Sequence, residues 1–127
     1  VTYWNKLLEI DPQNKVILTR LGDAYRNMEV YKAAEEYYSR ALDIDFDIYA
    51  AMGLALICKC EGKYNEAIDR FKNLIRNDSK NYRLYIDLAD CYIRQNRKDE
   101  AIKALEDFQT QGIHSSAVNE MLENLKK

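Results

Sequence analysis

The chain of 127 residues contains a single proline, Pro12, and only four glycines. This scarcity favours helices over a turn-rich all-β fold, because proline and glycine supply most tight turns. No apolar run approaches the ~20 residues that a membrane-spanning helix needs, so direct membrane insertion is not expected. No block of like charges occurs, and 19 basic residues against 21 acidic ones leave a net charge of −2. This balance argues against binding to nucleic acid.

Cysteine and histidine are equally sparse. The three cysteines are odd in number, and Cys58 and Cys60 are two apart on a predicted helix, so their side chains point to different sides. Reduced thiols are therefore expected, which favours a cytoplasmic location and leaves a periplasmic one open. The single histidine, His114, has no partner placed to complete a metal site. Phosphate-binding loops, nucleophile elbows and paired catalytic carboxylates are lacking, so we expect neither an enzyme nor a cofactor.

Hydrophobic residues make up 47% of the chain, which is enough for a folded core. They recur at steps of three and four residues, as in Leu18, Leu21 and Tyr25, and this is helix periodicity. The pattern predicts eight helices, over residues 2–11, 14–28, 31–44, 47–60, 64–77, 81–95, 98–111 and 115–126. Asn14, Asp47 and Ser115 are the expected N-caps, and Gly112 stands where a helix end often needs a positive φ.

The chain repeats itself with a period of 33 to 34 residues. Short polar breaks separate the two helices of each repeat, which predicts antiparallel neighbours. Three alanines recur at the period, each followed four residues later by an aromatic residue or leucine: Ala34 with Tyr38, Ala67 with Phe71, and Ala101 with Leu105. A small residue allows two helices to cross closely. Each hairpin alone leaves an apolar face uncovered, so stacking of the repeats is expected.

These residues resemble the tetratricopeptide repeat. The first unit matches its signature most fully, with Leu18, Leu21-Gly22, Tyr25, Ala34, Tyr38 and Ala41-Leu42. It departs from the signature at Phe46, where proline is usual. The later units are looser and keep Leu54-Ala55, Gly62, Tyr64, Ala67 and Phe71 in the second, and Tyr85, Leu88-Ala89, Tyr92 and Ala101 in the third. The resemblance covers almost the whole chain.

The resemblance implies an all-α fold, a right-handed superhelical solenoid of antiparallel helix hairpins. We expect one domain over residues 1–127, cut from a longer protein. Its expected parts are a half repeat over 1–14, three repeats over 15–47, 48–81 and 82–115, and a capping helix over 116–127. Such arrays bind other proteins, so the expected function is that of a non-enzymatic interaction module or scaffold.

In this family the first helix of each hairpin lines a concave groove, which holds a peptide or amphipathic helix of a partner. Its middle is apolar here, and its arginines can pair with acidic groups beside the anchors. The alternative is that these side chains are buried against the following hairpin or the cap. By register the groove residues are Thr19, Asp23, Arg26, Tyr49, Met52, Leu56, Lys59, Arg83, Ile86, Asp90, Ile93 and Arg94.

Two further modes of binding can be weighed from the sequence. Some family members clamp a chaperone's C-terminal carboxylate with Lys, Asn and Arg side chains. Only Arg83 fits that clamp here, and Asp23 would repel a carboxylate, so we do not expect it. The second mode is self-association into a homo-oligomer through the terminal helices. Tyr3, Trp4 and Leu7 lack the cover of a complete first repeat, so the chain could stack end to end through them.

Overall fold

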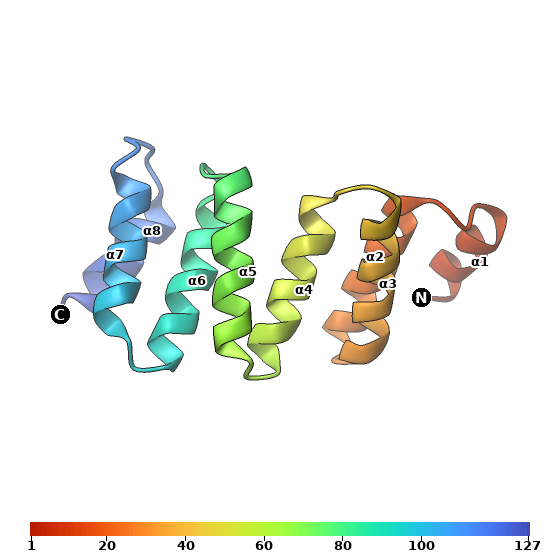
Figure 1. Cartoon of the computed structure of the whole chain (residues 1–127), viewed down its shortest axis with the longest axis horizontal. Helices are drawn as coiled ribbons and strands as arrows, with labels where there is room; N and C mark the ends of the chain where they lie inside the picture. Colours follow the sequence, from red (N-terminus) through yellow and green to blue (C-terminus); the bar gives the residue numbers. More distant parts are fainter. The chain divides into compact units, whose positions relative to one another are not determined.

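The structure, a computed structural model, describes all residues 1–127 and consists of helices joined by short loops (Figure 1). Each helix begins and ends within two residues of its predicted bounds, which confirms the all-α reading. The helices are α1 (Thr2–Ile10), α2 (Lys15–Asn27), α3 (Tyr31–Ile44), α4 (Ile48–Cys60), α5 (Tyr64–Asn77), α6 (Tyr82–Arg94), α7 (Lys98–Gln109) and α8 (Ser116–Leu125). None of them is long and apolar enough to cross a lipid bilayer.

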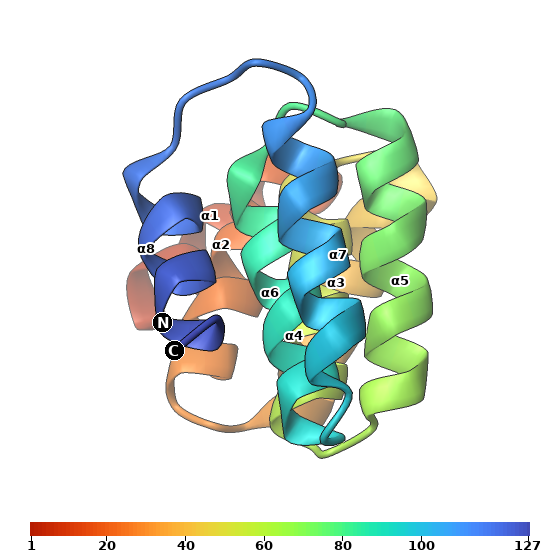
Figure 2. The same cartoon turned by 90° about the vertical axis from the view of Figure 1, so that its left-hand side faces the viewer.

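The helices group into two compact units, Val1–Ile57 and Cys58–Lys127, which we call unit 1 and unit 2. In unit 1, α2 and α3 pack together as an antiparallel hairpin, and α1 packs on α2. In unit 2, α6 packs against both α5 and α7, and α8 covers α6 and α7. Figure 2 shows this last arrangement from the side of α8.

Side-chain caps begin three of the helices at the predicted residues. The Asn14 and Ser115 side chains accept hydrogen bonds from the backbone amides of Ile17 and Val118, at 3.2 and 3.3 Å. Asp47 accepts a hydrogen bond from the amide of Tyr49 at 2.9 Å. Each bond satisfies an amide of the first helical turn, which has no partner within the helix.

The 33- to 34-residue period also appears in the backbone of the loops. Two positions beyond the ends of α2, α4 and α6 stand Glu29, Gly62 and Asn96, with positive φ values of 62°, 77° and 58°. In each loop the amide of the next residue bonds to the carbonyl five positions earlier, at 2.9, 2.8 and 2.8 Å. This is the bond of a Schellman-type helix end, which needs a left-handed residue. The turn between paired helices is therefore one conformation used three times.

Tyr38 occupies the centre of the unit 1 core and is fully buried. Its ring lies against Gly22 of α2 and Gly53 of α4, and a Cβ on either glycine would overlap ring atoms. Glycine at both positions therefore lets three helices approach one another around the ring. The aromatic residue that follows the repeated alanine fills the gap to the next helix, as the repeat pattern predicts.

The core of unit 2 is built from the same kinds of residue. Ala67 and Ala101 have no exposed surface, and Phe71 and Leu105 are likewise fully buried. Phe108 is also buried and meets Tyr85 edge to face, with ring centroids 5.1 Å apart. The small residues thus mark close helix crossings, and the large ones fill the space beside them.

Candidate functional site

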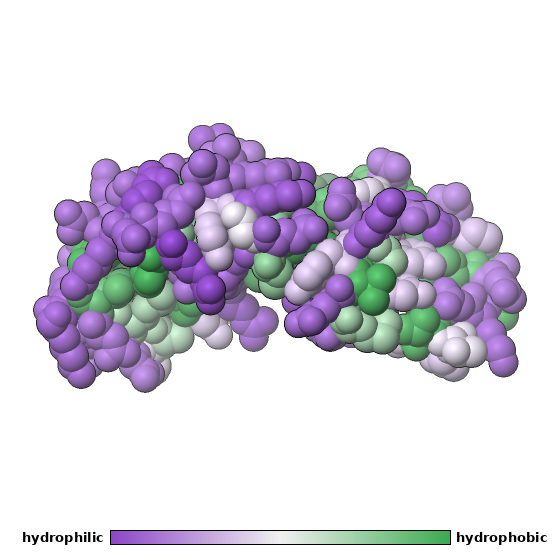
Figure 3. All heavy atoms as spheres, turned by 90° about the horizontal axis from the view of Figure 1, so that it is seen from below, coloured by the Kyte–Doolittle hydropathy of each residue, from purple (hydrophilic) through white to green (hydrophobic).

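The one aromatic residue of the predicted groove is Tyr49, at the start of α4, and it is 69% exposed. Met52 and Leu56 follow it at steps of three and four and are partly buried. At 100° per residue, the three side chains fall within about 60° of one another around the helix. They form one apolar stripe, which we call the α4 stripe. In Figure 3, hydrophobic atoms in green lie at the surface of both units among hydrophilic ones.

The polar groove residues of α2 bind within their own unit. The Thr19 side chain is buried, and its hydroxyl donates to Asp47 at 3.2 Å. The Tyr38 hydroxyl donates to the Asp23 carboxylate at 2.5 Å and accepts from the Arg26 guanidinium at 3.1 Å. Burial, followed by the bond to Asp23, raises the pKa of Tyr38. Asp23 and Arg26 therefore hold the core tyrosine in place.

Within unit 2, Lys59 joins the groove residue Asp90 and a second carboxylate of α6, that of Asp87. Its ammonium lies 2.6 Å from the Asp90 carboxylate and 3.3 Å from that of Asp87. Burial alone would lower the pKa of Lys59, but its bonds to these two carboxylates outweigh that effect and raise it. Arg94 reaches the same Asp90 at 3.5 Å. Two cations, Lys59 and Arg94, thus balance the two carboxylates within unit 2.

The remaining groove residues of α6 are apolar or basic. Ile86 and Ile93 are partly buried, two turns apart on the helix. Arg83 is exposed at the first turn, and its guanidinium lies 6.0 Å from the centre of the Tyr82 ring. This part of α6 therefore combines aliphatic surface with positive charge.

The residues predicted for self-association lie on α1 and differ in exposure. Tyr3 is 67% exposed and meets Trp4 edge to face, with ring centroids 5.4 Å apart. Trp4 and Leu7 are partly buried and pack against the hydrophobic core of unit 1. Ile10, at the end of the same helix, is 82% exposed. The exposed apolar surface of α1 thus comes mainly from Tyr3 and Ile10.

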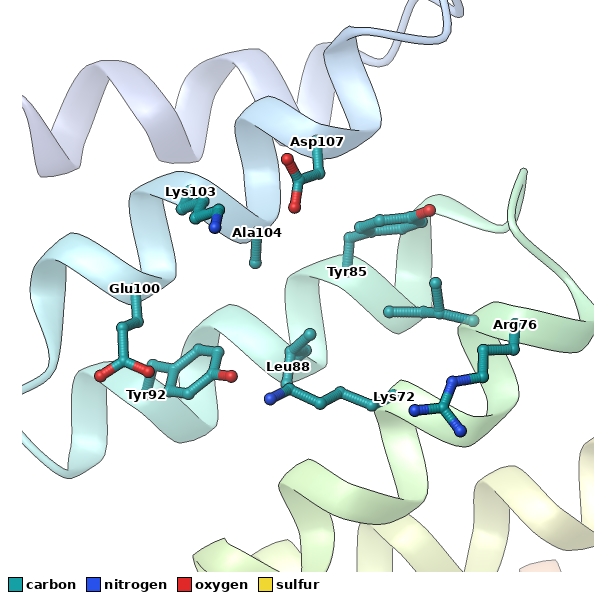
Figure 4. Close-up of a pocket in the computed structure, with 10 residues that line it drawn as sticks. Lys72, Arg76, Tyr85, Leu88, Tyr92, Glu100, Lys103, Ala104 and Asp107 are labelled. Atoms are coloured by element: carbon teal, nitrogen blue, oxygen red, sulfur yellow. The ribbon is translucent and has the colours of Figure 1, made fainter.

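Unit 2 also contains a cavity of about 420 Å³, which no motif in the sequence predicts. It lies between α5 and α7, and residues of α6 also line it. We call it the α5–α7 cleft (Figure 4). The one feature of the sequence that hints at this cleft is the pair of basic residues Lys72 and Arg76, which are one turn apart on α5. The cleft is lined by Lys72, Ile75, Arg76, Tyr85, Leu88, Tyr92, Glu100, Lys103, Ala104 and Asp107.

Several known proteins are similar to this chain. Protein O-mannosyl-transferase Tmtc3 of Drosophila melanogaster is 29% identical over 121 residues, which cover 89% of this chain but only 13% of that protein. PcrH from Pseudomonas aeruginosa has a similar structure, with a TM-score of 0.77, 17% identity and coverage of 89% of this chain and 92% of that one. The Yersinia enterocolitica type III secretion translocator chaperone SycD gives a TM-score of 0.73 at 22% identity, covering 86% and 81%.

The likeness to the solved structures shows a common fold, an all-α helical repeat solenoid. Two family models described as tetratricopeptide repeat match the chain, one over residues 17–48 and the other over residues 61–111. Both matches fall on hairpins whose repeated alanines, ring-filled cores and left-handed loop residues are described above. The chain therefore belongs to the tetratricopeptide repeat family, whose members are generally non-catalytic protein–protein interaction modules.

Proposed function

We propose that this chain holds a peptide or an amphipathic helix of a partner protein on the exposed side of the first helix of its hairpins. The observation that carries the proposal is the α4 stripe, headed by a tyrosine that is 69% exposed. Tyrosine and methionine are enriched where proteins bind one another, because they offer large apolar contact area and adaptable shape. Tyr49 is the expected anchor, with Met52 and Leu56 beside it.

The α6 helix of unit 2 offers contacts of its own to a partner. Ile86 and Ile93 offer aliphatic surface, and Arg83 at the first turn offers a planar cation that can bind a carboxylate through two hydrogen bonds. Lys59 and Asp90 bind each other, so a partner would gain little by pairing with either of them. We therefore expect an apolar partner segment with an acidic residue, rather than a highly charged one.

A capture experiment with matched variants tests the proposal. The wild-type chain, a Tyr49→Ala/Met52→Ala variant and a Tyr3→Ala control, all with confirmed helicity, are used to capture proteins from a lysate of the source organism. We expect a protein that the wild type and the control retain and the double variant loses. Equal capture by all three would place binding elsewhere, and the assignment of the α4 stripe would then be wrong.

Self-association is the second candidate, favoured by the exposure of Tyr3 and Ile10 on α1. Two copies that cover this apolar surface would gain about 25 cal/mol for each Å² removed from water. Sedimentation velocity over a wide concentration range measures the association, and Tyr3→Ser should weaken it. A chain that stays monomeric at the highest concentration rules out this candidate.

A further inference from the structure

The α5–α7 cleft is separate from the side of α6 that the proposed function uses. Tyr85, Leu88 and Tyr92 form its floor, whereas Ile86 and Ile93 belong to the predicted groove. At 100° per residue, the two sets point about 115° apart around α6. A partner bound to one set therefore leaves the other accessible, and unit 2 carries two distinct surfaces.

The floor of the cleft is apolar and held in place by its neighbours. The Tyr85 hydroxyl donates to the Ser79 carbonyl at 2.9 Å and accepts from the Gln111 side chain at 3.2 Å. The Arg97 guanidinium lies 4.7 Å from the centre of the Tyr92 ring. Leu88 lies between these rings (Figure 4). A fixed floor of this kind lowers the entropy cost of binding a side chain.

The rim of the cleft is mostly positive. Lys72 and Arg76 stand on α5, and Lys103 stands on α7; none of the three forms an ion pair. Two carboxylates also lie on α7. Glu100 accepts two hydrogen bonds from Arg97, at 2.6 and 2.7 Å, so its charge is already balanced. Asp107 lies toward the Tyr85 end, away from the α5 cations (Figure 4).

We propose that the α5–α7 cleft is a second docking site, and that its occupant is an acidic segment of a partner protein. An aliphatic or aromatic side chain of that segment packs on Leu88 between the two tyrosine rings. A neighbouring Asp or Glu binds Lys72 and Arg76, whose charges it complements. The Asp107 carboxylate disfavours an acidic residue at the other end and so sets the direction of the segment. A cavity of about 420 Å³ accommodates such an anchor.

Selection from a displayed random-peptide library on the whole chain tests this site. We expect enriched peptides that carry an apolar residue beside an Asp or Glu. Their affinity, measured by fluorescence anisotropy, should fall about tenfold or more in Lys72→Glu/Arg76→Glu. The control, Lys80→Glu/Lys98→Glu, makes the same change of charge at two exposed lysines outside the cleft and should leave binding intact.

Several outcomes would overturn the proposal. One is a selection that yields no binding peptide, and another is a set of enriched peptides without acidic residues. A third is an equal loss of affinity in both charge variants, which would indicate attraction by net charge alone. Loss in Tyr49→Ala/Met52→Ala, with Lys72→Glu/Arg76→Glu unaffected, would place the peptides on the α4 stripe and support the proposed function instead. Self-association that Lys72→Glu/Arg76→Glu abolishes would make the occupant a second copy of the chain.

Discussion

The Tyr38 ring leaves no room for a side chain at Gly53, so Gly53→Ala should destabilise the fold. A Cβ at position 53 would overlap the ring Cζ atom and lie 2.5 and 2.7 Å from Cε2 and Cε1. Carbon atoms in good contact are about 3.5–4.0 Å apart. The ring cannot simply move away, because it also lies against Gly22 and its hydroxyl is held by Asp23 and Arg26.

The expected magnitude combines two opposing effects. Overpacking a core position costs about 1–3 kcal/mol, and overlap with three ring atoms points to the upper end of that range. Replacing a glycine inside a helix by alanine returns about 1 kcal/mol through helix propensity. We therefore expect Gly53→Ala to lower the free energy of unfolding by about 1–2 kcal/mol. Urea unfolding followed by far-UV circular dichroism measures this difference.

A second background separates the overlap from other effects of the substitution. Tyr38→Leu removes the ring atoms that the new Cβ would meet. In that background Gly53→Ala should instead stabilise the chain by up to about 1 kcal/mol, because only the helix-propensity gain remains. The reversal of sign is the expected result. An equal loss in both backgrounds, or no loss in the wild type, would refute the reasoning.

Three other predictions concern unit 2. Ala67→Leu should lower the free energy of unfolding by about 1–3 kcal/mol in urea, because Ala67 is fully buried at a helix crossing. Lys59→Met should cost about 1–3 kcal/mol at neutral pH. The pKa of Lys59 is raised above its ordinary value of 10.5, so its ion pairs persist at neutral pH. The difference in free energy of unfolding between Lys59→Met and wild type should shrink only above about pH 10.5. An unchanged difference beyond that pH would contradict the role of the Lys59 ion pairs. Burial raises the pKa of the Cys58 thiol, and that of the Cys91 thiol to about 11. Exposed Cys60 alone should therefore react quickly with Ellman's reagent in the native chain. Rapid reaction of two thiols would contradict the burial of Cys58 and Cys91.

The helices and their repetition could be predicted because they depend on local pattern. Apolar residues at helical spacing predicted the bounds of each helix to within two residues. Asn14, Asp47 and Ser115 could be predicted as N-caps because each bonds an amide only two or three positions away. The repeated alanines and the residues that follow them indicated close crossings between paired helices. Repetition reinforced each weak local signal three times, which is why the family could be recognised without the structure.

The groove set was predicted by register alone, and register does not show what each side chain contacts. The polar groups of Thr19, Asp23 and Arg26 bind residues of unit 1 that are 12 to 28 positions away in the chain. Lys59 likewise binds Asp87, which is 28 positions away. Hydrogen bonds between such distant residues depend on how the helices pack, and no local pattern reports them.

By itself, the sequence of this protein determined the helices, their period, their caps and the family, because each follows from spacing within about one turn or one repeat. Only the tertiary structure decided which polar side chains bind other residues of the chain and which apolar side chains stay exposed. It also decided that Lys72 and Arg76 of α5, Lys103 of α7 and the tyrosines of α6 meet around one cavity. These residues come from three helices, and they share a surface only after those helices have packed.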